Sequence, residues 1–179
     1  MAIDWAAQVI EQLDWHWQAQ LRPRLDGLTD DEYLWEPTPG AWTIHPDAQP
    51  DHRIDWAYPA LAPAPVTTIA WRLTHVIVGC LGQRSASHFG GPPVDYDSHP
   101  YARTAREALH QLDRGYARWL AGVRGWAADR TMGVPLGPAE GHFADDPRGA
   151  LVLHINREVI HHGAEISLLR DLWAHRDPT

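Results

Sequence analysis

The chain has 179 residues, 44% of them hydrophobic, with a formal net charge of −8 at pH 7 and a single cysteine, Cys80. This length favours one domain, residues 1–179, and the acidic balance argues against a nucleic acid or an anionic membrane as partner. One cysteine excludes an intrachain disulfide, no stretch is apolar enough to span a membrane, and the N-terminus lacks a signal-peptide pattern. We therefore expect a cytoplasmic protein.

Four segments repeat apolar residues at the spacings of three and four that are typical of an amphipathic helix. These segments cover residues 5–25, 67–89, 101–128 and 147–175. A long proline-rich connection separates the first two, and within it Thr29 and Glu32 form the pattern of a capping box, which predicts one short helix. This organisation predicts an all-α fold, a four-helix bundle with a long crossover between helices 1 and 2.

The ends of two of these helices carry signals of their own. Thr67 or Thr68 is expected to cap the second helix. Asp146 is expected to cap the fourth, with Pro147 in its first turn. Between the third and fourth helices the sequence predicts at most a brief strand or hairpin.

The second helix is apolar on most sides, which predicts a central place in the bundle. His75 shares a face with Gly79 and Gly82, so we expect room for a cavity beside it. A lone histidine in such a place is either a core residue bonded to a neighbouring helix or a metal ligand. Cys80 lies about 140° from His75 at roughly 100° per residue, and we interpret it as a small buried hydrophobic residue rather than a nucleophile.

The fourth helix carries Glu158 and His162 four residues apart, on one helical face. His162 lies roughly 20°, and Glu158 roughly 60°, from the centre of the apolar stripe. A carboxylate buried beside an imidazole is costly unless something compensates, and a divalent metal would do so. Together with His75, this pair predicts a site for zinc or nickel with a coordination position left open. The alternative is a site without metal, in which Glu158 pairs with His162 or Arg72.

Residues around this pair have two interpretations each. His154, one turn before the carboxylate, either lines the mouth of a pocket or is a surface residue. His161 either supports the ligands or lies on the surface. Arg157 and Glu165 either contact an acidic substrate or a thiol, or form solvated salt bridges. Trp42, in the long first connection, either walls the site or packs into the core.

The first helix carries tryptophans on and off its core stripe. Trp17 falls on the stripe, whereas Trp15 and Trp5 fall off it and are expected to be exposed. Exposed tryptophans are typical of a partner surface, and a second copy of the chain is the simplest partner. We therefore predict a homodimer.

Motifs in three parts of the chain resemble the DinB-like superfamily. They are residues 71–76 (WRLTHV), residues 156–166 (NREVIHHGAEI) and the earlier stretches 28–32 (LTDDE) and 39–42 (PGAW). The resemblance implies a four-helix bundle with one metal site, whose ligands are a histidine on the second helix and two residues four apart on the last. Those positions are His75, Glu158 and His162, in the Glu-then-His form of members resembling mycothiol-dependent maleylpyruvate isomerase.

The same resemblance implies an activity in general terms. It points to a metal-dependent S-transferase or related enzyme that acts on a small electrophile with a low-molecular-weight thiol of the mycothiol or bacillithiol type. It assigns no catalytic residue beyond the ligands. The alternative from another functional class is a non-catalytic metal-binding or stress-response protein. An enzyme should keep a coordination position open, whereas a structural clamp should show a closed shell of four ligands.

Overall fold

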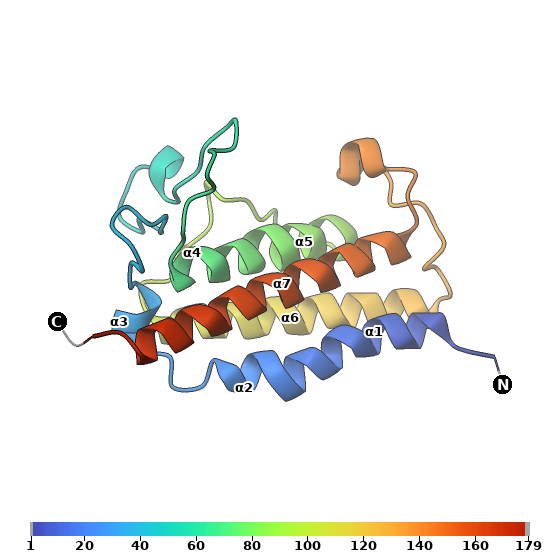
Figure 1. Cartoon of the computed structure of the whole chain (residues 1–179). Helices are drawn as coiled ribbons and strands as arrows, with labels where there is room; N and C mark the ends of the chain where they lie inside the picture. The colour runs from blue at the N-terminus through green and yellow to red at the C-terminus, as the bar shows by residue number, and fades with distance from the viewer. Residues whose placement is uncertain (1, 178–179) are drawn as a thin grey trace.

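The computed structural model describes residues 2–177 and consists of helices joined by loops (Figure 1). Within these residues, β pairing is limited to isolated bridges. The all-α bundle expected from the sequence is confirmed. Its four long helical stretches are α1 (Trp5–His16) with η1 (Trp17–Leu21) and α2 (Arg22–Arg24), α4 (Ile69–Thr74) with η3 (His75–Gly82) and α5 (Gln83–Phe89), α6 (Ala105–Ala128), and α7 (Arg148–Ala174).

Three short helices lie in the connections: α3 (Asp30–Tyr33), the 3-10 turn η2 (Pro50–His52) and the 3-10 helix η4 (Pro138–Phe143). Thr29 caps α3 as expected, because its hydroxyl accepts a hydrogen bond from the Glu32 amide at 3.2 Å. The second half of the expected capping box is not seen, since the Glu32 carboxylate pairs with Arg170 of α7 at 2.7 Å. No helix of the described residues is long and apolar enough to cross a membrane.

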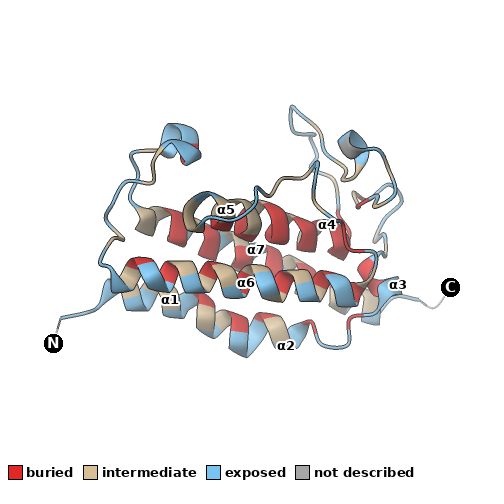
Figure 2. Cartoon of the chain, turned by 180° about the vertical axis from the view of Figure 1, so that it is seen from behind, coloured by how far each residue is buried: buried red, intermediate tan, exposed pale blue. Residues whose placement is uncertain are grey.

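The stretch α4–η3–α5 occupies the centre of the fold. It packs against both α6 and α7, and the three long connections all lie on its remaining side (Figures 1 and 2). Thr68 caps it, with its hydroxyl accepting from the Trp71 amide at 3.1 Å. Because protein surrounds this stretch, apolar residues on most of its sides are buried, as the red ribbon of Figure 2 shows.

The beginning of α7 differs from the expectation. Pro147, in extended conformation, precedes the first helical residue, and no side chain caps the helix, so the prediction of Asp146 as the cap was wrong. The preceding loop takes over this role: the amides of Arg148 and Gly149 donate to the carbonyls of Val134 and Met132 at 3.0 and 2.9 Å. These contacts satisfy amides that a helix leaves without partners in its first turn.

Candidate metal centre

The side chains of His75, Glu158 and His162 meet between η3 and α7. The Nε2 atom of His162 lies 3.4 Å from Glu158 Oε2, and His75 Nε2 lies 4.0 Å from the same oxygen. The two imidazole rings meet edge to face, with centroids 4.7 Å apart. The fold therefore brings together the three residues that the sequence proposed as a site, from segments more than 80 positions apart.

Glu165 controls the orientation of the His162 ring. Its carboxylate lies 2.7 Å from His162 Nδ1, and an ionised carboxylate only accepts hydrogen bonds. This short contact favours the tautomer with the proton on Nδ1 over the longer approach of Arg72 Nη1, a donor 3.4 Å from the same nitrogen. Arg72 holds this carboxylate in turn, at 3.1 Å; Arg72 is thus paired with Glu165, not with Glu158. In the neutral ring, the Nε2 lone pair then faces the Glu158 oxygen. Two acceptors at this separation repel unless a cation, either a metal ion or a proton, lies between them.

Tyr96 holds the His75 ring in the corresponding way. Its hydroxyl lies 2.9 Å from His75 Nδ1, and in the tautomer with Nδ1 protonated, the ring donates to this oxygen and Nε2 is free. Gly79 makes the contact possible, since a Cβ there would lie 2.4 Å from the Tyr96 hydroxyl. The expected cavity beside His75 on this face is therefore filled, by Tyr96. Burial, followed by the nearby His162, lowers the pKa of His75 to about 4, so this imidazole is neutral at neutral pH.

Aromatic residues connect the site to the long first connection. The Trp71 ring lies nearly parallel to that of His75, with centroids 5.7 Å apart, and its indole N–H donates to the Asp55 carbonyl at 2.9 Å. Trp42 is half-buried and lies against Trp71, with ring centroids 6.0 Å apart. Trp42 thus supports the ring that covers His75.

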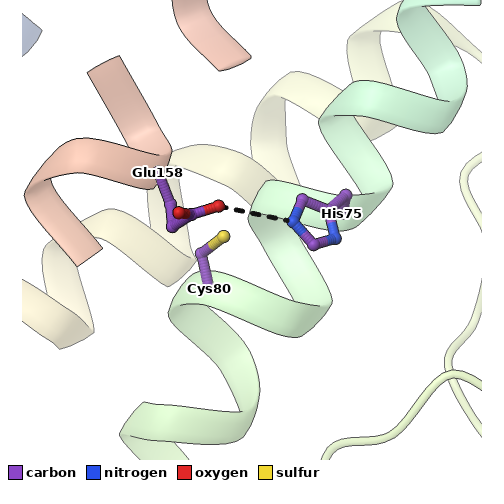
Figure 3. A group of neighbouring side chains, drawn as sticks. All are labelled: His75, Cys80 and Glu158. Atoms are coloured by element: carbon purple, nitrogen blue, oxygen red, sulfur yellow. Dashed lines mark ion pairs between the residues drawn. The ribbon is translucent and has the colours of Figure 1, made fainter. Parts of the chain in front are cut away.

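Cys80 is buried in the core, as the sequence predicted, but it also lies beside two of the candidate ligands, which the sequence did not predict. Its sulfur, a His75 ring nitrogen and a Glu158 carboxylate oxygen lie within 4.8 Å of one another (Figure 3). The estimate of 140° was wrong because residues 75–82 form a π-helix, in which i→i+5 bonding brings residue 80 close to the face of residue 75. Gly82 permits this winding, since a Cβ there would lie 2.7 Å from the Ile77 carbonyl oxygen. Two glycines inside an apolar helix were the available signal.

The flanking residues divide into two groups. His161 is two-thirds exposed and lies 3.3 Å from the Glu165 carboxylate, so it is a surface residue that touches a supporting group. His154 lies 3.8 Å from Glu158. Together with Arg157, it borders a cavity of about 250 Å³ between α5, α7 and η4. The interpretation of His154 as a pocket residue therefore agrees with its position.

This cavity combines an apolar wall with charged groups. The side chains around it are Arg84, Leu136, Glu140, Phe143, Asp146, Ala150, Leu151, His154 and Arg157. Buried contacts hold its η4 side in place, because the Glu140 carboxylate lies 2.9 Å from His88 Nε2 and 3.1 Å from Arg84 Nη1. The cavity is of a size for a small molecule and lies one helical turn from Glu158.

The separations from Glu158 Oε2 to the two imidazoles fit a divalent metal. Bonds of about 2.0 Å to nitrogen and oxygen put neighbouring donors of a tetrahedral site about 3.3 Å apart. The separations of 3.4 and 4.0 Å around Glu158 Oε2 require only small side-chain movements to reach that value. Both imidazoles also have their Nδ1 atoms held by a second residue, an arrangement that typically accompanies metal-bound histidine.

Comparison with known proteins gives one match. The family model of the DinB superfamily matches residues 12–166, a range that includes His75, Glu158 and His162. Comparisons with curated proteins and with solved structures found no match.

Proposed function

This chain belongs to the DinB superfamily, and from that premise we propose that it is a metal-dependent enzyme that transfers a low-molecular-weight thiol to a small electrophile. His75, Glu158 and His162 hold the metal, with zinc or nickel as the expected ion. Mycothiol and bacillithiol are the type of thiol expected. We place the activity in the cytoplasm, because the chain contains one cysteine and therefore no intrachain disulfide.

One observation carries the metal part of this proposal. His162 Nε2 faces Glu158 Oε2 at 3.4 Å while Glu165 occupies its Nδ1. In a neutral histidine, that arrangement leaves two acceptors facing each other, which a divalent cation turns into two favourable bonds. The alternative without metal places a proton between His162 Nε2 and Glu158 Oε2, carried by either group, and metal analysis distinguishes the two.

Different residues of the chain have different roles in such a reaction. A bound metal supplies a Lewis acid that favours the anionic form of a thiol. Tyr96 and Glu165 orient the two imidazoles, Trp71 covers His75, and the cavity beside His154, one helical turn before Glu158, could hold the electrophile. In the transfer, the thiol sulfur bonds to carbon, and the leaving group departs with its bonding electrons and takes up the thiol proton. No oxidant or reductant is needed.

The test begins with metal analysis of the purified chain, followed by a screen of thiols against electrophiles. We expect one zinc or nickel per chain and thiol consumption that stops when a chelator removes the metal. A chain that binds metal but consumes no thiol in any pairing would favour the non-catalytic metal-binding alternative, which the proximity of Cys80 as a fourth donor also supports. A chain without stoichiometric metal would contradict both.

Glu165→Ala tests whether the Glu165 carboxylate holds the His162 ring in the orientation that binds metal. Removing the carboxylate leaves His162 Nδ1 without its acceptor and Arg72 without its ion pair. We expect the metal affinity to fall by about 10–100-fold, the usual effect of losing a group that holds a ligand, with the number of sites unchanged. Chelator competition measures the affinity, and Glu11→Gln, on the exposed face of α1, is the matched control. Equal affinities for the two variants would contradict the assignment.

We further propose that the chain forms a homodimer through α1. Trp5 and Trp15 are 70% and 58% exposed there, in agreement with the sequence-based expectation, and Trp15 borders a hollow together with Gln12 and Ile160. Trp15→Glu is expected to give a 20.2 kDa monomer by light scattering, because a charge replaces an apolar contact. Trp56→Glu, at a tryptophan equally exposed but in the first connection, should leave the dimer intact. A wild-type chain that is monomeric at micromolar concentration would refute the proposal.

A further inference from the structure

Cys80, the single cysteine of the chain, lies against the candidate metal ligands although it is almost completely buried, with 3% of its surface exposed. Figure 3 shows its sulfur beside both the His75 ring and the Glu158 carboxylate, with the three ligand atoms within 4.8 Å of one another.

The helix around Cys80, like η1 elsewhere in the chain, is wound as a π-helix, and here the winding serves this contact. Residues His75–Gly82 are wound as a π-helix, whereas α4 before them and α5 after them are α-helical. The π-helix is rare, usually occurs as a single turn and is frequent at functional sites. Here it turns the residue five positions after His75 toward the same site. It also needs a glycine at position 82, which costs about 1 kcal/mol relative to alanine in a helix interior.

We propose that the Cys80 thiolate is a fourth protein ligand of the metal, completing a set with His75, Glu158 and His162. This inference rests on the proposed function, since it requires metal at this place. Thiolate is a preferred donor for zinc, and four protein donors make the tetrahedral shell that zinc favours. Bonds of about 2.3 Å to sulfur and 2.0 Å to nitrogen separate donors by about 3.3–3.8 Å. The ligand atoms of His75, Cys80 and Glu158 lie within 4.8 Å of one another and so need to approach by about 1.5 Å or less, while His162 joins them through its 3.4 Å separation from Glu158 Oε2.

The metal also determines the protonation of this thiol. Burial, followed by the Glu158 carboxylate, raises the pKa of Cys80 to about 12, so the metal-free chain keeps the thiol protonated. Metal binding releases this proton to solvent, as it does for other cysteine ligands. A Cys80 thiolate in the shell closes the position that a free thiol would use. A thiol substrate would then have to displace Cys80, which would take up the proton of that thiol and become a neutral thiol again.

Cobalt(II) is the probe for this proposal, because thiolate bound to cobalt gives a near-ultraviolet charge-transfer band that imidazole and carboxylate do not give. The full chain is titrated with cobalt(II) in buffer without any added thiol. We expect visible d–d bands and the charge-transfer band to grow together to one equivalent. Since the chain has a single cysteine, the band can arise only from Cys80. Cys80→Ala and Cys80→Ser should keep the d–d bands and lose the charge-transfer band.

Two further measurements complete the test. Val78→Ala, which removes a buried side chain from the same helix, should keep both sets of bands and thus controls for lost packing. Added 2-mercaptoethanol should restore the charge-transfer band in Cys80→Ala, at a lower concentration than is needed to perturb the wild-type spectrum. Wild-type d–d bands without a charge-transfer band would overturn the role of Cys80 and leave the proposed metal site standing. A wild-type chain that binds no cobalt(II) would overturn both.

Discussion

His75→Ala and His162→Ala are each expected to abolish stoichiometric binding of zinc or nickel while the helical circular-dichroism spectrum survives. Each substitution removes a nitrogen that faces Glu158 Oε2, at 4.0 Å for His75 and 3.4 Å for His162. Loss of a group that merely supports a ligand costs about 10–100-fold in affinity, so loss of a ligand should exceed 100-fold. Metal content after gel filtration and chelator competition measure the effect.

His161→Ala is the matched control for these substitutions. His161 is the sequence neighbour of His162, but its side chain is 67% exposed and touches only the supporting Glu165 among the acidic residues of the site. It should keep the metal, and Glu158→Ala should weaken binding by more than His161→Ala does. If the variants of all three proposed ligands kept their metal content, these residues would not form the metal site.

Arg170→Ala is expected to lower the free energy of unfolding by about 3–5 kcal/mol, the usual cost of removing one partner of a buried ion pair. Arg170 binds both oxygens of Glu32, at 2.7 and 3.2 Å, and its Nη1 also donates to the Arg24 and Asp26 carbonyls at 2.6 and 2.9 Å. The Glu32 side chain is only 4% exposed, so the substitution leaves a carboxylate without its cation inside the protein. The pair joins α7 to α3, and the carbonyl contacts join α7 to the end of α2 and the turn after it.

Urea unfolding measures this loss, which corresponds to a decrease of roughly 10 °C in melting temperature for a domain of this size. Arg114→Ala, at an exposed position of α6, is the control and should change stability little. The double variant Arg170→Met with Glu32→Gln should recover part of the loss, because no charge then remains unpaired. If Arg170→Ala cost no more than Arg114→Ala, the ion pair would not hold these segments together.

Local sequence determined the helices and half of the site. Apolar spacing predicted four long helical stretches, and each lies within a few residues of its expected bounds because amphipathic periodicity depends on one helix at a time. The caps at Thr29 and Thr68 follow from a side chain and an amide three residues later. The proximity of Glu158 and His162 is of the same kind, since four residues along a helix make one face.

Tertiary structure decided everything that joins distant segments. Tyr96 reaches His75 from the connection after α5, and Arg72 crosses from α4 to hold Glu165 on α7. The first turn of α7 is satisfied by loop carbonyls instead of by Asp146, because antiparallel contacts keep the chain extended through Pro147. Such contacts cannot be predicted from the apolar periodicity of a single segment.

Cys80 shows most clearly what could not be predicted from the sequence alone. A regular α-helix, the geometry assumed when a sequence is read alone, turns residue 80 away from residue 75. The folded chain winds this stretch as a π-helix around Gly82 and packs it against α6 and α7, which brings the sulfur to His75 and Glu158. Sequence therefore identified His75, Glu158 and His162 as possible ligands, whereas the winding and packing of η3 decided that Cys80 also lies beside His75 and Glu158.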